Sequence, residues 1–349
     1  MKARRVAVVA FATPGDGGGL SGQGHGGPER SARARSGHRA RPGALPSSEF
    51  AELDAEAERL RTTRARTSDG RWKIGAVYDG TVPARRSDEG QWARSLALHE
   101  QWVKSSPSSP AAHIALADYW FHYAWKARGG GFANTVTEQG WKLFGERLTT
   151  AREVLEKCRA FATRDPIWYY VMLGVAKGEG WDVERYDALF EEAVTKEPDF
   201  LGHYFDKANY MLPRWTGDPK ALARFVDQSV ARTKDRLGYE LYARIYWATL
   251  QSIGTEGLRD GEVDWPKMRQ GFRDMERTFP DDWNRNAFAY YACEANDVKT
   301  AAEVIARFGE PDLGVWKTRE KFEACKSGKP TFEERAGDAE PARKGDTTI

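Results

Sequence analysis

Apolar positions recur at helical spacing from residue 110 onward, and the helical stretches come in pairs. Gly, Pro or Asp separates the two members of a pair, and these residues end or cap helices. Paired stretches predict an internal repeat in which each hairpin buries its apolar face against the next one. We therefore expect an all-α protein whose main part, residues 109–310, is an α-solenoid of helical hairpins.

One stretch matches a tetratricopeptide unit at six positions. The residues at unit positions 4, 7, 8, 24, 27 and 32 are Tyr170, Leu173, Gly174, Phe190, Ala193 and Pro198. Small residues at positions 8 and 27 let two helices approach closely, while aromatic residues fill the gap to the neighbouring hairpin. Partial matches continue the pattern at Leu116, Ala117, Trp120, Tyr204, Ala208, Tyr239, Ala243, Tyr246, Trp283, Ala287, Tyr290, Ala306 and Pro311. The pattern predicts about five tetratricopeptide-like hairpins.

The segments on either side of the repeats have other compositions. Within 48–108, residues 50–66 predict an amphipathic helix and residues 71–78 an extended segment, which together would form a small N-terminal cap. Residues 311–349 are expected to form a C-terminal segment that is largely a disordered tail, because the chain becomes polar after Cys325. Two insertions, at 127–136 and 254–261, interrupt the repeat spacing.

The N-terminal segment, residues 1–47, is expected to be disordered or processed. Residues 13–48 contain ten Gly and almost no large apolar residue, so they have nothing with which to form a core. Residues 1–12 have the order of a secretory signal, a basic start followed by a short apolar run, but they could also precede the true start of translation. We favour a cytoplasmic protein, with export after signal cleavage as the alternative.

Charge and hydropathy narrow the classes of partner. Residues 51–325 carry 40 Lys and Arg against 43 Asp and Glu. A nucleic-acid-binding face needs an excess of basic residues, so we expect no nucleic-acid partner. No stretch approaches the roughly 18 apolar residues of a membrane span, so none is expected. The 13 Trp among 42 aromatic residues predict an interior filled with large flat side chains.

Catalytic and metal-binding motifs are not visible. Cys158, Cys293 and Cys325 have no CxxC spacing, so we expect three buried free thiols. The six His show no HExxH pattern, and we expect neither a metal nor a cofactor. Whether the chain is an enzyme stays open, although these observations favour a non-catalytic role.

The repeat register selects residues for a binding groove. Positions 5, 9 and 12 of the first helix of each hairpin are expected to line the concave surface, and they are occupied by Asp118, Phe121, Val175, Asn209, Arg244, Trp247, Phe288 and Tyr291. Aromatic residues mixed with Asn and Arg suit an extended peptide, which favours a binding or assembly module for a peptide or partner protein. Alternatively, the aromatic residues simply pack inside the superhelix.

A second possible site is a small pocket around residues 125–141. Several polar groups lie near two tryptophans there, and the candidate residues are Trp125, Arg128, Asn134, Glu138 and Trp141. Such a pocket would make the chain a small-ligand-binding protein or an enzyme. The glycines at 129–131 lack the Gly-Lys-Ser/Thr ending of a phosphate loop, so we expect a loop or helix C-cap at that point.

Several segments carry a family resemblance. They are residues 50–54, 70–74, 123–136, 140–144 and 212–218. The sequence resembles, over roughly residues 48–310, an uncharacterised bacterial family known as a domain of unknown function. The resemblance implies a tetratricopeptide-like fold without an assigned activity, so it implies no functional residue.

Overall fold

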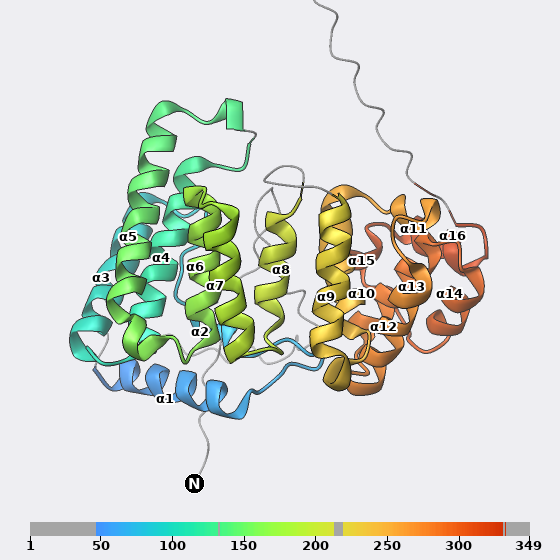
Figure 1. Cartoon of the computed structure of the whole chain (residues 1–349), viewed down its shortest axis with the longest axis horizontal. Helices are drawn as coiled ribbons and strands as arrows, with labels where there is room; N and C mark the ends of the chain where they lie inside the picture. Colours follow the sequence, from blue (N-terminus) through green and yellow to red (C-terminus); the bar gives the residue numbers. More distant parts are fainter. Residues whose placement is uncertain (1–46, 132, 213–218, 331, 333–349) are drawn as a thin grey trace, which may run out of the picture. The chain divides into compact units, whose positions relative to one another are not determined.

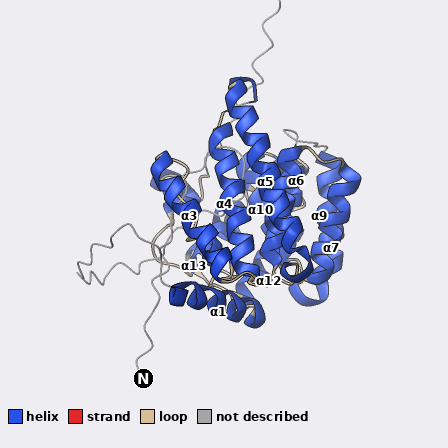
Figure 2. Cartoon of the chain, turned by 90° about the vertical axis from the view of Figure 1, so that its left-hand side faces the viewer, coloured by secondary structure: helices blue, strands red, loops and turns tan. Residues whose placement is uncertain are grey.

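The computed structural model describes residues 47–131, 133–212, 219–330 and 332. This part of the chain folds into sixteen α-helices and one short 3-10 helix, with no strand beyond an isolated bridge between Arg66 and Trp72 (Figures 1 and 2). The predicted all-α class is confirmed. The chain divides into two compact units, residues 1–222 and 223–349, which are described separately below.

The N-terminal unit contains the first eight helices. They are α1 (Ser47–Thr63), α2 (Gly75–Asp79), α3 (Glu89–Ser105), α4 (Pro110–Arg128), α5 (Glu138–Ala162), α6 (Pro166–Glu179), α7 (Val183–Lys196) and α8 (Leu201–Tyr210), with the 3-10 helix η1 (Ala133–Thr135) between α4 and α5. Helices α4 and α5 pack as a pair, as do α6 and α7, while α4, α6 and α8 contact one another in succession. Helix α1 contacts α3 and α4 and runs across their ends (Figure 1).

Helix boundaries in this unit follow capping rules. Ser109 accepts a hydrogen bond from the Ala112 amide at 3.1 Å at the start of α4, and Pro110 occupies the first turn, where its missing N–H costs nothing. Gly180 ends α6 with φ of 69°, a left-handed conformation that glycine adopts without a steric penalty. Asp182 then caps α7 by accepting from the Arg185 amide at 2.8 Å.

A close helix contact occurs where the repeat register placed a small residue. A Cβ added to Gly174 on α6 would lie 2.8 Å from Cζ of Phe121 on α4. This distance is shorter than a normal van der Waals contact, so the two helices pack this closely only because residue 174 is glycine.

The C-terminal unit contains the remaining helices, although α9 begins four residues before the unit boundary. They are α9 (Pro219–Leu237), α10 (Glu240–Ile253), α11 (Gly257–Asp260), α12 (Trp265–Thr278), α13 (Asp282–Glu294), α14 (Val298–Ile305), α15 (Leu313–Trp316) and α16 (Arg319–Lys326). Helices α10 and α12 pack as a pair, and so do α13 and α14. A Cβ added to Gly271 on α12 would lie 2.8 Å from Cβ of Ala243 on α10, so a small residue at unit position 8 again lies at a close crossing.

Helices thus occur where the five hairpins were expected, and assignment to the tetratricopeptide class stays a prediction. Three details differ. Helix α3 was not predicted, residues 75–79 form a helix where an extended segment was expected, and α15 and α16 follow the last predicted repeat. Burial explains the last difference, because Trp316 and Phe322 are at most 2% exposed and hold these short helices in place. The predictions for residues 1–46 and 333–349 lie outside the described residues.

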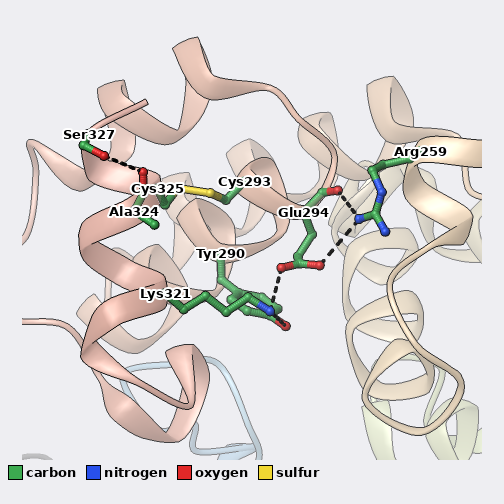
Figure 3. Close-up of a disulfide and its surroundings, with 8 residues drawn as sticks. All are labelled: Arg259, Tyr290, Cys293, Glu294, Lys321, Ala324, Cys325 and Ser327. Carbon is green, nitrogen blue, oxygen red and sulfur yellow. Dashed lines mark hydrogen bonds and ion pairs between the residues drawn. A yellow bond between two sulfur atoms is a disulfide. The ribbon is translucent and has the colours of Figure 1, made fainter. Parts of the chain in front are cut away.

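The prediction of three free thiols was wrong for two cysteines. Cys293 at the end of α13 and Cys325 on α16 form a disulfide with a Cα–Cα distance of 6.0 Å (Figure 3). Cys158 is free and buried, as expected. The pairing depends on how α16 packs, which the 32-residue separation did not indicate. Within the described part of the chain, none of the helices combines the length and apolar character needed to cross a membrane.

Candidate binding site on the N-terminal unit

The predicted groove residues of the C-terminal unit are part of its interior. Trp247, Phe288 and Tyr291 are at most 6% exposed. The Phe288 ring stacks on Phe272 with 5.1 Å between centroids, and the Tyr291 hydroxyl donates to the Trp247 carbonyl at 3.1 Å. The alternative interpretation, in which these aromatic residues pack inside the protein, describes what is observed.

Arg244 is also buried, and this corrects its predicted place on an open surface. Its Nε donates to the carboxylate of Glu240, one helical turn earlier, at 2.6 Å, and both side chains are at most 3% exposed. The Arg244 guanidinium is thus paired with Glu240 inside the protein. It is not available to bind a ligand.

The predicted groove residues of the N-terminal unit behave similarly. Asn209 is 1% exposed and accepts a hydrogen bond from Lys177 at 3.3 Å. Asp118 is 4% exposed and lies 3.4 Å from Nε2 of His122. Val175 is buried, and Phe121 is half-buried against Gly174. These positions serve packing and internal pairing.

The second predicted site is a stack of side chains. The Arg128 guanidinium lies 5.6 Å from the ring centroid of Trp125 and 5.5 Å from that of Trp141, and it donates to the Gly131 carbonyl at 3.0 Å. Asn134 and Glu138 are exposed. Gly129 is the C-cap of α4 with φ of 76°, so the loop interpretation of the glycines is confirmed. Of the five candidates, only Trp141 lines a depression of the surface described below.

That depression lies on α5, α6 and α7. Its volume is about 690 Å³, and its lining residues are Trp141, Phe144, Gly145, Thr149, Arg152, Gly178, Glu179, Trp181 and Arg185. A smaller neighbouring depression of about 230 Å³ also contains Trp181 and Arg185 in its lining. We call these two depressions together the Trp181 face. Trp181 and Arg185 are the two residues common to both.

The turn between α6 and α7 sets the position of these two side chains. After the left-handed Gly180, the Trp181 amide donates to the Ala176 carbonyl at 3.0 Å, which fixes the backbone at the helix end. Asp182 begins α7, so Arg185 lies in its first turn. The Arg185 guanidinium lies 3.3 Å from the ring centroid of Trp181, a cation–π contact.

The Trp181 face has an excess of positive charge around its larger depression. Glu179 accepts from Nε of Arg152 at 3.1 Å and from Nε1 of Trp181 at 2.8 Å. The hydrogen bond to Glu179 raises the pKa of Arg152, so this pair is charged and internally satisfied. No described residue forms an ion pair with Arg185. Two arginines therefore face one glutamate in the larger depression, whereas the smaller depression adds Arg159 together with Glu156 and Glu192.

The exposed aromatic surface adds to this chemistry. The Trp141 side chain is 41% exposed, which makes it one of few large apolar residues at the described surface. Tryptophan and arginine are the residues most enriched among those that dominate the energy of protein interfaces. The Trp181 face therefore offers flat apolar surfaces and an arginine able to bind a carboxylate.

Reasoning from the sequence missed Trp181 and Arg185, although a local signal exists. Gly180 and Asp182 are a helix stop and a helix start with a single residue between them, which predicts a tryptophan in an interhelical turn. Arg185 follows three residues after Asp182, which places it in the first turn of the next helix, beside the turn that holds the tryptophan. The repeat register selected residues only from the first helix of each hairpin, so it did not include these two.

The architecture defines an all-α protein of consecutively packed helix pairs. Residues 40–170 match the family described as Domain of unknown function (DUF4034), which confirms the predicted resemblance to an uncharacterised family over this segment. No curated protein and no solved structure matches the chain. The matched segment ends within α6, before Trp181 and Arg185.

Proposed function

We propose that this chain is a non-catalytic binding module whose contact surface is the Trp181 face. Its partner would be a protein segment in which acidic side chains flank an aromatic or aliphatic one. The observation that carries the proposal is the Arg185 guanidinium, which is stacked on Trp181 between two depressions and has no ion pair with a described residue.

The chemistry of the face supports an acidic partner. An arginine stacked on an indole has lost part of its conformational freedom, so forming two parallel hydrogen bonds to a carboxylate costs less entropy. The exposed Trp141 ring would cover an apolar side chain of the same partner. Because the larger depression is wide open, it suits an extended segment better than an enclosed small molecule.

This proposal retains the predicted binding function but assigns it to a different surface of the protein. The predicted groove residues are buried apart from the half-buried Phe121, whereas the Trp181 face lies on the second helices α5 and α7 and on the end of α6. The alternative of a small-ligand pocket at residues 125–141 has less support, because Asn134 and Glu138 do not line the depression that contains Trp141.

Peptide display tests the proposal with three variants of the full chain. A random peptide library selected on the parent protein should yield segments with at least two Asp or Glu near an aromatic residue. Trp181→Ala and Arg185→Ala should each lower the affinity for the selected peptides at least tenfold. Arg185→Lys should restore only part of this affinity, since lysine lacks the planar guanidinium.

Lys142→Ala is the matched control, because Lys142 lies on α5 next to Trp141 but is 66% exposed and does not line the face. It should bind as the parent does. A library that selects basic or uncharged peptides, or equal affinity of the parent and Arg185→Ala for the selected peptides, would refute the proposal. Affinity of the parent should also fall more steeply with added salt than affinity of Arg185→Ala.

The disulfide also bears on the compartment in which the module works. Disulfides persist mainly in oxidising compartments, so the bond between Cys293 and Cys325 supports the exported alternative over the cytoplasm that the sequence favoured. Counting alkylatable thiols in protein trapped directly from the native cells tests this point. One thiol per denatured chain supports an oxidising compartment, and three contradict it.

A further inference from the structure

The last helix of the C-terminal unit is fastened to α13 at two adjacent positions. Cys325 of α16 is bonded to Cys293, and Nζ of Lys321 lies 2.8 Å from the carboxylate of Glu294 (Figure 3). Glu294 is 2% exposed. A covalent link and a buried ion pair thus hold the same short helix to the end of α13.

Glu294 has a second set of partners that does not belong to α16. Nη1 of Arg259 donates to its backbone carbonyl at 3.0 Å and lies 3.7 Å from its carboxylate (Figure 3). The Thr255 hydroxyl also donates to the carboxylate. The carboxylate therefore keeps a cation and a hydrogen-bond donor when Lys321 is absent. Departure of α16 does not leave an unpaired buried charge, which would be strongly unfavourable.

Helices α15 and α16 cover an aromatic surface of α13. The Trp316 ring lies 5.7 Å from Tyr290 and 5.0 Å from Phe322, and its Nε1 donates to Oδ1 of Asn286 at 2.8 Å. Phe322 is also 6.2 Å from Phe308, which follows α14. The cover therefore buries side chains of its own and of the two helices beneath it.

Neither covering helix is stable by itself. Helix α15 has four residues and α16 has eight, whereas isolated helices shorter than about 12 residues are marginal in water. Their position depends on packing and on the crosslink. Cys293 and Cys325 are at most 5% exposed, so a reductant reaches the sulfur atoms only after α16 has lifted.

We propose that α15 and α16 form a cover that oxidation locks onto the α13–α14 pair. A small-molecule disulfide closes the bond by thiol–disulfide exchange: Cys293 and Cys325 lose two electrons and two protons, their sulfur atoms join, and the small disulfide is reduced to two thiols. The new bond holds the cover closed. A small dithiol reverses the step: the bond breaks, both cysteines become thiols, and the dithiol becomes a disulfide. The chain without the bond opens at the cover, exposing Tyr290 and Trp316, while the rest of the C-terminal unit stays folded. This inference does not depend on the Trp181 face.

Hydrogen exchange of the full chain, measured by mass spectrometry, tests the proposal. The oxidised parent is compared with the same protein after incubation with dithiothreitol, and alkylation of three thiols in a denatured sample of the reduced protein confirms complete reduction. Amides of residues 313–326 should exchange at least about tenfold faster after reduction, since a disulfide closing a loop of this size contributes a large part of local stability. Amides of α10 should not change.

Two variants complete the test. Cys325→Ser should reproduce the reduced pattern without any reductant, and Cys158→Ser should behave as the oxidised parent, because Cys158 is not part of the bond. Equal protection of residues 313–326 in the oxidised and reduced chains would overturn the proposal. Loss of protection in α10 and α12 together with α16 would also overturn it, because the bond would then hold the whole unit and not a cover.

Discussion

Nζ of Lys177 on α6 donates to Oδ1 of Asp206 on α8 across 2.6 Å, and the two side chains are 2% and 10% exposed. The same ammonium donates to Oδ1 of Asn209 at 3.3 Å, and the Tyr186 hydroxyl donates to the other carboxylate oxygen of Asp206 at 3.1 Å. One lysine thus joins α6 to α8 through a buried polar network, whose members strengthen one another in a medium of low polarity.

Removal of this lysine should destabilise the N-terminal unit. We expect Lys177→Met to lower the free energy of unfolding by about 3 kcal/mol, because the Asp206 carboxylate stays buried without its cation. Denaturant unfolding followed by circular dichroism measures the change. Lys142→Met, on an exposed face of α5, should change stability by less than about 0.5 kcal/mol. A Lys177→Met midpoint equal to that of the parent would show that the network contributes nothing.

Replacement of two helical glycines by alanine should change the stability of the protein in opposite directions. Gly174→Ala brings a methyl group to within 2.8 Å of Phe121, so we expect a loss of about 1 to 3 kcal/mol. Nothing lies within 4 Å of a Cβ at Gly145 on α5, so Gly145→Ala should stabilise the helix by about 0.5 to 1 kcal/mol. Thermal unfolding of both variants checks the signs, and equal shifts would contradict the close contact between α4 and α6.

Acid should destabilise the fold through His203. Complete burial lowers the pKa of this imidazole from 6.5 to about 4, even though Nε2 donates to the Pro166 carbonyl at 3.0 Å. Between these two values the unfolded chain binds more protons than the folded one, so stability falls as the pH drops from about 6.5 to 4, by roughly 3 kcal/mol in total.

His203→Gln keeps a hydrogen-bond donor without a titrating group, so its stability should vary less over the same pH range. Comparing the two proteins separates the contribution of His203 from that of groups whose protonation stabilises the fold as the pH falls. One of these groups is Asp79 on α2. Desolvation raises the pKa of its carboxyl group to about 6, and the nearby Asp118 carboxylate adds to this shift. Parallel pH profiles for the parent and the variant would be inconsistent with a neutral buried His203.

The free thiol of Cys158 should be unreactive in the folded protein. Burial raises the pKa of this thiol to about 11, and only the thiolate attacks an alkylating agent. Iodoacetamide at pH 8 should leave the oxidised native chain unlabelled and label one site after denaturation. Rapid labelling of the native chain would show that α5 opens near residue 158.

The sequence predicted the helices because apolar spacing and capping residues are local signals. Gly174 could be assigned to a close helix contact from its repeat position alone, and the structure places Phe121 against it. The same reasoning placed Asn209 and Arg244 on an open groove, whereas both are buried. Burial of Asn209 depends on Lys177, 32 residues earlier, and burial of Arg244 depends on how α10 packs against α12.

The other features that the sequence did not predict also depend on tertiary structure. The partners Cys293 and Cys325 meet only because α13 through α16 fold back on one another. The half-buried position of Trp181 depends on a turn between two helices, and a periodic pattern within helices contains no information about such a turn. Local capping signals at Gly180 and Asp182 were present and would have singled it out.

The end of the family match at residue 170 has a practical consequence for producing parts of this protein. Helix α6 spans Pro166–Glu179, so a recombinant fragment cut at the family boundary would retain five of its fourteen residues. Such a fragment would lose Gly178, whose backbone lies against Phe144 and Leu148 of α5, and would expose that apolar surface to solvent. Aggregation during expression is the expected result. A fragment ending at Leu212 would keep α6 to α8 whole and should remain dispersed, because its helix pairs stay covered.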